Sequence, residues 1–149
     1  MSDNLSNVLA GAMRLLAARE HSQFELRRKL GQKGHEAQDI EQALEQLADQ
    51  SLQSDERFVE SFVNSYRERG KGPKRIRLEL QQHQLSVELI DTYLDERDEV
   101  WKASAVQVKQ KKFGDDAATD YPQQMKQAKF LEYRGFTHEQ ISYVLKNYE

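Results

Sequence analysis

The stretch SDERFVESFVNSYRERGKGPKRIRLEL, residues 54–80, decides the fold, because it places two amphipathic helical patterns on either side of a short turn. Its basic half, residues 67–77, carries six cationic side chains and one acidic one, although the whole chain has a net charge of -3. Gly70 and Gly72 are predicted to take the positive φ that ends a helix, and Pro73 suits the first turn of the next helix. The stretch therefore predicts a helix, a tight basic turn and a second helix.

This basic turn is a candidate site for anions. Its backbone amides and the N-terminus of the second helix are expected to face the same way as Lys71 and Lys74, and helix N-termini attract anions. The alternative is a solvated loop whose cations keep the protein soluble. Tyr66 is expected in the core, with base stacking as its alternative, and Arg75 has an alternative role in a weak surface ion pair with Glu79.

A pattern of apolar positions recurs along the chain at intervals of about 50 residues. A shift of 50 places Leu26 on Ile76 and Leu44 on Leu94, and a shift of 101 places Leu44 on Leu145. Each copy contains three helical patterns, and strand signals are nearly absent. The sequence predicts an all-α protein of three tandem three-helix repeats, stacked into an elongated, curved body. The repeats are predicted at residues 1–53, 54–97 and 98–149, the last with a longer internal loop at 113–121.

Local signals indicate where helices begin and which faces they bury. Ser22 and Glu25 have the spacing of a capping box, and Ser54 or Asp55 is predicted to cap the first helix of the second repeat. The first helix of the chain has apolar residues at three- and four-residue spacing, which predicts one buried face. That face comprises Leu5, Val8, Leu9, Ala12, Met13, Leu15 and Leu16.

The sequence offers no arrangement that points to catalysis. The H-E-x-x patterns at His35 and His138 reach Asp39 and Ser142 where a zinc pair would need a second histidine. The glycines of the turn lack both a preceding strand and the spacing of a nucleotide-binding loop. We therefore expect no enzyme, no catalytic residue, no metal site and no cofactor.

The amino-acid composition indicates the cellular compartment in which the protein is expected. The chain has no cysteine, which suits a reducing environment. It contains no run of about 18 apolar residues, and its first residues lack the basic and apolar regions of a secretory signal. We expect a cytoplasmic protein without a membrane segment.

Four segments, in register over nearly the whole chain, resemble the recurring motifs of the RecX family of recombinase regulators. They are LAAREHSQFELRRKL at 16–30, SDERFVESFV at 54–63, GKGPKRIRLEL at 70–80 and RGF at 134–136. The resemblance implies a bacterial cytoplasmic protein of tandem three-helix repeats. It also implies binding to the RecA recombinase filament on DNA, with restraint of filament growth, strand exchange and co-protease activity.

The resemblance together with the charge pattern gives a set of candidate contacts for that filament. The expected contacts are Arg27, Arg28, Lys71, Lys74, Arg75 and Arg77, aimed by a supporting turn of Gly70, Gly72 and Pro73. We also expect weak, sequence-independent contact with DNA, and a monomeric protein. The alternative is an autonomous helical DNA- or RNA-binding module that acts without a recombinase.

One pair of residues departs from the family pattern. Where members often have Lys-Gly at the end of the second helix of the middle repeat, this chain has His83 and Gln84. Gln84 is therefore expected to adopt a left-handed conformation or an alternative cap.

Overall fold

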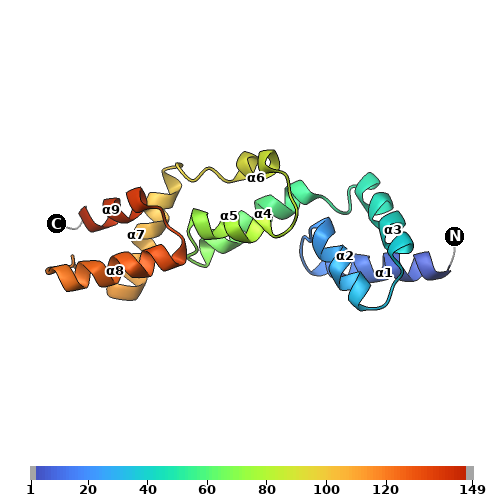
Figure 1. Ribbon diagram of the computed structural model, residues 1–149, viewed down its shortest axis with the longest axis horizontal. Helices are drawn as coiled ribbons and strands as arrows, with labels where there is room; N and C mark the ends of the chain where they lie inside the picture. The colour runs from blue at the N-terminus through green and yellow to red at the C-terminus, as the bar shows by residue number, and fades with distance from the viewer. Residues whose placement is uncertain (1–2, 147–149) are drawn as a thin grey trace. The chain divides into compact units, whose positions relative to one another are not determined.

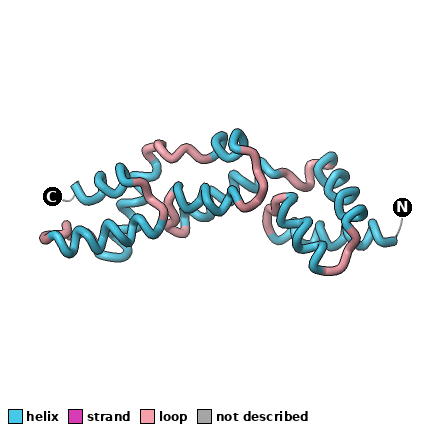
Figure 2. The backbone as a smooth tube through the Cα atoms, viewed as in Figure 1, coloured by secondary structure: helices cyan, strands magenta, loops and turns pink. Residues whose placement is uncertain are grey.

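The structure, a computed structural model, describes residues 3–146. Within this range every regular element is a helix, and Figure 2 shows helices joined by loops without a strand. Figure 1 labels the nine helices of the described chain: α1 (Asp3–Ala18), α2 (Gln23–Gln32), α3 (Ala37–Asp49), α4 (Asp55–Glu68), α5 (Pro73–Gln81), α6 (Val87–Tyr93), α7 (Val100–Phe113), α8 (Tyr121–Arg134) and α9 (His138–Lys146). The all-α prediction is confirmed. The outer ends of the predicted first and third repeats, residues 1–2 and 147–149, lie outside the described residues.

The chain divides into two compact units. The first unit comprises the residues up to Ser61 together with His83–Leu85, and the second comprises Phe62–Gln82 and the residues from Ser86 onward. Each unit has its own packing and is described by itself.

In the first unit, α1, α2 and α3 pack against one another around an aliphatic core. Its fully buried members are Leu5, Val8, Ala12, Leu26, Leu30, Ile40, Ala43, Leu44 and Leu47. The predicted face of α1 is correct except at Met13, whose side chain is 49% exposed. At about 100° per residue, Met13 lies at the border of the stripe centred on Leu5 and Ala12, so the core does not reach it.

Side-chain caps begin several helices where the sequence predicts them. Ser22 and Glu25 form a complete capping box on α2, and the Ser54 hydroxyl accepts a hydrogen bond from the Arg57 amide at the start of α4. Gln84 has a φ of 55°, which confirms the expected left-handed residue at a position that lacks glycine.

In the second unit, α7, α8 and α9 pack against one another. Trp101, in the first turn of α7, is buried, and its indole N–H donates to the Asp95 carbonyl at 2.9 Å. Lys109 is also buried, and its ammonium donates to the carbonyls of Gly114 (2.8 Å) and Asp116 (2.6 Å). These bonds tie the loop after α7 to the helix, an arrangement that the apolar pattern does not predict.

Candidate functional site

The turn between α4 and α5 is formed partly as the sequence predicts. Gly70 has a φ of +84°, and the Gly70 and Lys71 amides donate to carbonyls in the last turn of α4. Pro73 opens α5 in its first turn, as expected. Gly72 is different, because it precedes α5 with an extended backbone at φ -87°, so the prediction of a positive φ there is wrong.

Gly72 is needed for a close approach between two backbones. A Cβ atom built on it would lie 2.3 Å from the carbonyl carbon of Gly135, the residue that ends α8. Gly135 itself has a φ of +103°, and a Cβ there would lie 2.4 Å from the Cβ of Arg75. We call this contact between Gly72 and Gly135 the glycine joint, and it leaves no room for a side chain on either residue.

Hydrogen bonds across the glycine joint use the amides that were expected to bind an anion. The Gly72 amide donates to the Arg134 carbonyl at 2.7 Å, and the Lys74 amide donates to the Gly135 carbonyl at 2.9 Å. The positive end of the α5 dipole thus meets the negative end of α8, which is a favourable arrangement. The prediction of an anion-binding corner made by these amides is wrong, because the third helical domain occupies it.

Two of the six candidate cations are already paired with carboxylates. Arg27 pairs with Glu41 at 2.7 Å, and this hydrogen bond raises the pKa of the Arg27 guanidinium. Arg77 pairs with Glu96 and, at 2.8 Å, with Asp91. Burial alone would lower the pKa of Arg77, but the hydrogen bonds to both acids outweigh it and leave the pKa raised. Their charge is largely balanced within the protein.

Among the described residues, Arg75 contacts a backbone carbonyl and an aromatic ring and not a carboxylate. Its guanidinium donates to the Tyr133 carbonyl at 3.3 Å and lies 5.4 Å from the centre of the Tyr133 ring. Within residues 3–146 it forms no ion pair with Glu79, so that alternative is not found. Arg75 therefore helps to hold α5 against the end of α8.

The remaining candidates, Arg28, Lys71 and Lys74, form no ion pair with any part of the chain that the structure describes. Arg28 and Lys74 are exposed, and Lys71 is half-buried. Arg28 belongs to the first unit with Arg27, whereas the other four candidates belong to the second unit. Of the predicted set, these three cations have their charge available.

A group of cations that have no carboxylate partner among the described residues surrounds a cleft of about 500 Å³ in the second unit. We call it the basic cleft, and its lining residues come from the end of α4, from Gly70, from α7 and from α8. They are Arg67, Glu68, Arg69, Gly70, Ser104, Gln107, Val108, Lys111, Lys112, Phe130 and Arg134. Five are basic and one is acidic, and none of the five basic residues pairs with a carboxylate among the described residues.

Aromatic and backbone contacts fix the shape of the basic cleft. The Lys112 ammonium lies 5.6 Å and the Arg134 guanidinium 5.1 Å from the centre of the Phe130 ring, which is within the range of cation–π attraction. Phe113 packs edge-on against Phe130 with ring centres 5.5 Å apart. Arg134 also donates to the Arg69 carbonyl at 3.2 Å, so the end of α8 is joined to the end of α4.

Signals for the basic cleft are present at separate places along the sequence. Arg67 and Arg69 belong to the basic stretch that organises the chain, and Lys111 and Lys112 form a basic pair at the end of α7. Arg134 directly precedes the glycine that ends α8. Spacing along one helix does not show that residues of α4, α7 and α8 line the same cleft, and therefore it does not predict this cleft.

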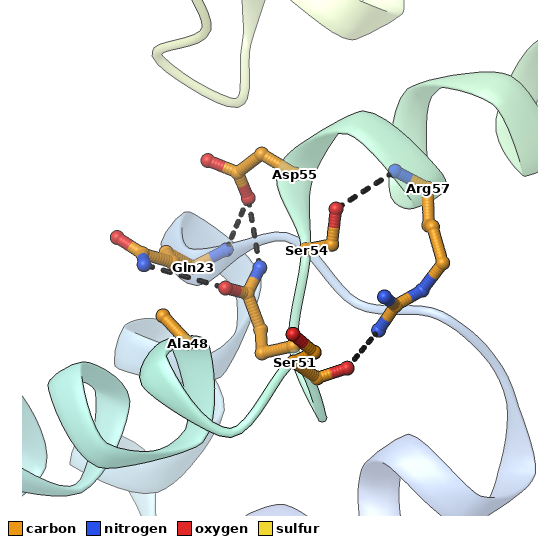
Figure 3. A pocket seen from close by; sticks show the side chains of 7 residues that line it. Gln23, Ala48, Ser51, Ser54, Asp55 and Arg57 are labelled. Carbon is orange, nitrogen blue, oxygen red and sulfur yellow. Dashed lines mark hydrogen bonds between the residues drawn. The ribbon is translucent and has the colours of Figure 1, made fainter.

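A second hollow, of about 330 Å³, lies in the first unit and is drawn in Figure 3. Its polar groups satisfy one another: Asp55 accepts from the Gln23 amide at 3.0 Å and from the Gln53 side chain at 2.9 Å. Arg57 donates to the Ser51 carbonyl at 2.8 Å. The hollow is thus a hydrogen-bonded connection between helices and not an array of groups awaiting a ligand.

Two histidines of the first unit are shielded from solvent, His21 fully and His83 in part. His83 contacts the Ser22 hydroxyl through Nδ1 at 2.9 Å and packs against the Phe58 ring, with ring centres 4.8 Å apart. His21 contacts the Arg19 carbonyl at 3.0 Å. Burial lowers the pKa of both imidazoles. Among the described residues no three His, Cys, Asp or Glu side chains are grouped as a metal site.

Nine described helices in three-helix sets are the architecture of a helical repeat protein. Comparison with family models identifies the sets. Residues 10–47 match the first three-helix domain of RecX, residues 54–94 the second and residues 102–145 the third. The chain belongs to the RecX family of regulatory proteins, which is a family of regulators and not of enzymes.

Similar proteins support this assignment over most of the chain. Regulatory protein RecX of Pseudomonas fluorescens (strain SBW25) is 46% identical over 144 residues, which cover 96% of this chain and 92% of the relative. Regulatory protein RecX of Halorhodospira halophila is 42% identical over 130 residues, which cover 87% and 81%. Both relatives carry the same name as the family.

Solved structures agree on the fold. A crystal structure of RecX from Lactobacillus salivarius has a TM-score of 0.79 at 20% identity and covers 99% of this chain and 97% of its own. A crystal structure of a regulatory protein RecX has a TM-score of 0.80 at 21% identity, with 97% and 74% covered. The prediction of three three-helix domains is confirmed. None of the described helices is long and apolar enough to cross a membrane.

Proposed function

We propose that this protein is a negative regulator of the bacterial RecA recombinase, which binds the RecA–DNA filament in the cytoplasm and inhibits filament growth, strand exchange and co-protease activity. Membership of the RecX family supports this function, as do relatives named Regulatory protein RecX at 42% and 46% identity. The observation that carries the proposal is the concentration of unpaired cations in the second unit of a chain whose net charge is -3.

A DNA-bound protein filament presents phosphates together with protein surface. The exposed cations Arg28 and Lys74 and the half-buried Lys71 have no intramolecular carboxylate partner in the described chain, so they can approach such anions without first breaking an ion pair. Arg27 and Arg77 would have to leave their carboxylate partners, which reduces what they contribute to binding. We therefore assign the electrostatic contacts chiefly to the unpaired set.

Inhibition follows from occupation of the filament and needs no chemical step. A chain of three helical domains that spans neighbouring recombinase protomers would block strand entry and disturb the addition of protomers at the filament end. Such binding requires no cofactor. It combines weak charge contacts with contacts to the recombinase, and the net negative charge of the chain disfavours tight binding to bare DNA.

The test is co-sedimentation of this protein with recombinase filaments and, in parallel, with bare single-stranded DNA at the same salt concentration. We expect binding to filaments at concentrations at least tenfold lower than binding to bare DNA, together with inhibition of strand exchange over the same range. Equal binding to both would favour an autonomous nucleic-acid module. Inhibition without any sedimentation on filaments would also contradict the proposal.

A further inference from the structure

We propose that the basic cleft is a binding site for the sugar-phosphate backbone of single-stranded nucleic acid. This inference rests on the proposed function in supposing that the chain works on DNA, but it assigns the DNA contact to residues outside the predicted set. Those residues are Arg67, Arg69, Lys111, Lys112 and Arg134. The cleft, and not the turn amides, would be where this protein meets phosphate.

The charge of the basic cleft is the first support. Five cationic side chains and a single acid, Glu68, line it, in a chain that has more acidic than basic residues overall. Arg69, Lys111 and Lys112 are exposed, and Arg67 and Arg134 are half-buried. Like charges held this close together repel one another, and an anion that entered the cleft would relieve the repulsion.

The placement of these cations is the second support. Phe130 attracts Lys112 and Arg134 to its ring, and the bond from Arg134 to the Arg69 carbonyl fixes the two walls to each other. A Cβ atom at Gly70 would lie 3.2 Å from Val108 and 3.3 Å from Arg134, so the turn approaches α7 and α8 closely. The side chains of Lys112 and Arg134 are thus held before a ligand arrives, which reduces the ordering cost of binding for these two cations.

The chemistry of the lining favours nucleic acid over an acidic protein segment. Val108 and Phe130 provide apolar surface next to the charges, which suits the sugar and base faces of nucleotides whose phosphates lie on the cations. Three of the five cations are arginines, whose planar guanidinium matches two oxygens of a phosphate or of a carboxylate at once, so the apolar surface is what distinguishes the two ligands. A volume of about 500 Å³ is within the usual range of ligand clefts, roughly 300–1,000 Å³.

The basic cleft has few uncharged polar groups that could discriminate between bases. The polar residues that line it besides the charged ones are Ser104 and Gln107, and both lie on one helix, α7. Affinity should therefore depend on phosphate number and salt and not on sequence, as expected for contacts to the backbone.

The experiment measures anisotropy of a fluorescent oligothymidine in the absence of recombinase, over a range of salt concentrations. The test variant replaces Lys111 and Lys112 with Gln on one wall of the cleft, and a second variant, Arg69→Gln, changes the opposite wall. The matched control replaces Arg14 and Lys33 with Gln. These are two exposed cations of the first unit, and the control has the same net charge as the double variant.

At about 0.1 M salt, the Lys111 and Lys112 variant should bind roughly 25-fold more weakly than wild type, because each lost phosphate contact removes about 0.7 of a released counterion. Its slope of log affinity against log salt should be smaller by about 1.4. Arg69→Gln should lose roughly fivefold, with a slope smaller by about 0.7. The control should match wild type in affinity and slope, and all variants should keep the wild-type melting transition.

Three outcomes would overturn the assignment: equal losses in the control, absence of oligonucleotide binding by wild type, or unchanged oligonucleotide binding in the cleft variants. Binding to fluorescent polyglutamate is measured in parallel. If the cleft variants lose binding to polyglutamate but keep binding to the oligonucleotide, the cleft takes an acidic protein segment instead. The filament sedimentation described above separates the two proposals, because it tests regulation of the recombinase whether or not the cleft binds free DNA.

Discussion

Two basic regions of the second unit use their charge in opposite ways. On α5, Arg77 is paired with Asp91 and Glu96, and Arg75 is held by the carbonyl and ring of Tyr133. In the basic cleft, Lys111 and Lys112 have no carboxylate partner within residues 3–146. Both regions look equally basic in the sequence. The first uses most of its charge to hold helices together. In the second, Arg134 is held by a carbonyl and a ring as Arg75 is, whereas Lys111 and Lys112 leave their charge without a carboxylate partner in the described chain.

The difference arises from where each cation lies relative to acidic side chains of other elements. Arg77 faces the loop after α6, which supplies Glu96, whereas the elements that line the cleft supply it with only one acid, Glu68. Lysine and arginine near the C-terminal end of a helix are favourable for that helix, since the cations complement the negative C-terminal dipole. Cations of this kind from α4, α7 and α8 line one cleft and create a binding surface as a consequence.

The strongest test of this comparison breaks the glycine joint. Gly72→Ala should lower the free energy of unfolding by about 3 kcal/mol or more, because the new Cβ meets backbone atoms at 2.3 Å that cannot move aside as a side chain would. Thermal unfolding followed by circular dichroism measures the effect. If the start of α5 were instead an open anion site, as the sequence suggested, this substitution would have little effect.

Gly31→Ala is the matched control for that experiment. Gly31 lies inside α2, and a Cβ there would have no atom within 4 Å. The substitution should stabilise the protein by about 0.5–1 kcal/mol, the usual gain when alanine replaces glycine within a helix. A similar loss at both glycines would show that the close approach at Gly72 is not the cause.

The next test compares available and paired cations directly in binding to recombinase filaments. Replacing Lys71 and Lys74 with Gln should raise the concentration needed for half inhibition of strand exchange about tenfold, which corresponds to roughly 0.7 kcal/mol per contact. Replacing Arg27 and Arg77 with Gln should raise it less than threefold at a temperature where the variant stays folded. A larger loss of inhibition in the Arg27 and Arg77 variant would mean that the ion pairs of these arginines open when the protein binds the filament.

Much of the fold was predictable because it depends on local rules. The apolar periodicity located the buried Leu26, Leu44 and Ile76, and the capping box located the start of α2. The joint at Gly72 was not predictable, because its partner Gly135 is far away in the sequence and backbone proximity leaves no periodic signal. The sequence indicated that Gly72 was special but gave the wrong reason, since close approach and positive φ both select glycine.

The candidate site was predictable only in part, for a related reason. The basic stretch located Lys71 and Lys74, which are available, but could not show that Arg77 has acidic partners on another element. It also gave no means to join Lys111 and Arg134 to Arg69 across three elements. Buried Lys109 shows the limit most clearly, because its ammonium is held by backbone carbonyls, which are present at every residue and give no sequence signal.

A smaller effect is expected from opening the ion pairs of α5. Arg77→Ala should cost about 1 kcal/mol of stability, since it removes two partly exposed ion pairs and leaves Asp91 and Glu96 without a cation. Lys74→Ala, at an exposed position nearby, should change stability by less than about 0.5 kcal/mol. Urea unfolding of both variants at low and high salt measures the difference, which should narrow as salt rises. Equal losses of stability in the two variants would mean that the ion pairs of Arg77 do not stabilise the fold.

The smallest expected effect concerns the protonation of His83, because partial burial disfavours the charged form of its imidazole. Burial lowers the pKa of His83, and the nearby Arg28 and Arg19 lower it further, while Glu25 and Asp55 oppose them. The unfolded chain therefore binds a proton more readily than the folded one. The stability contributed by neutral His83 is complete above the ordinary histidine pKa of about 6.5 and is lost as pH falls below it toward the lowered folded pKa. His21, whose pKa is also lowered by burial, acts in the same direction.

We accordingly expect the melting temperature to fall between pH 7 and pH 5, and His83→Gln to reduce that fall. Glutamine can keep a hydrogen bond to the Ser22 hydroxyl but does not titrate, so it separates protonation from packing. His138→Gln serves as the control because it removes an exposed imidazole from a different unit. Since His21 remains, the decrease should be reduced and not abolished. If His83→Gln and wild type lost the same stability between these two pH values, protonation of His83 would not be what the folded state resists.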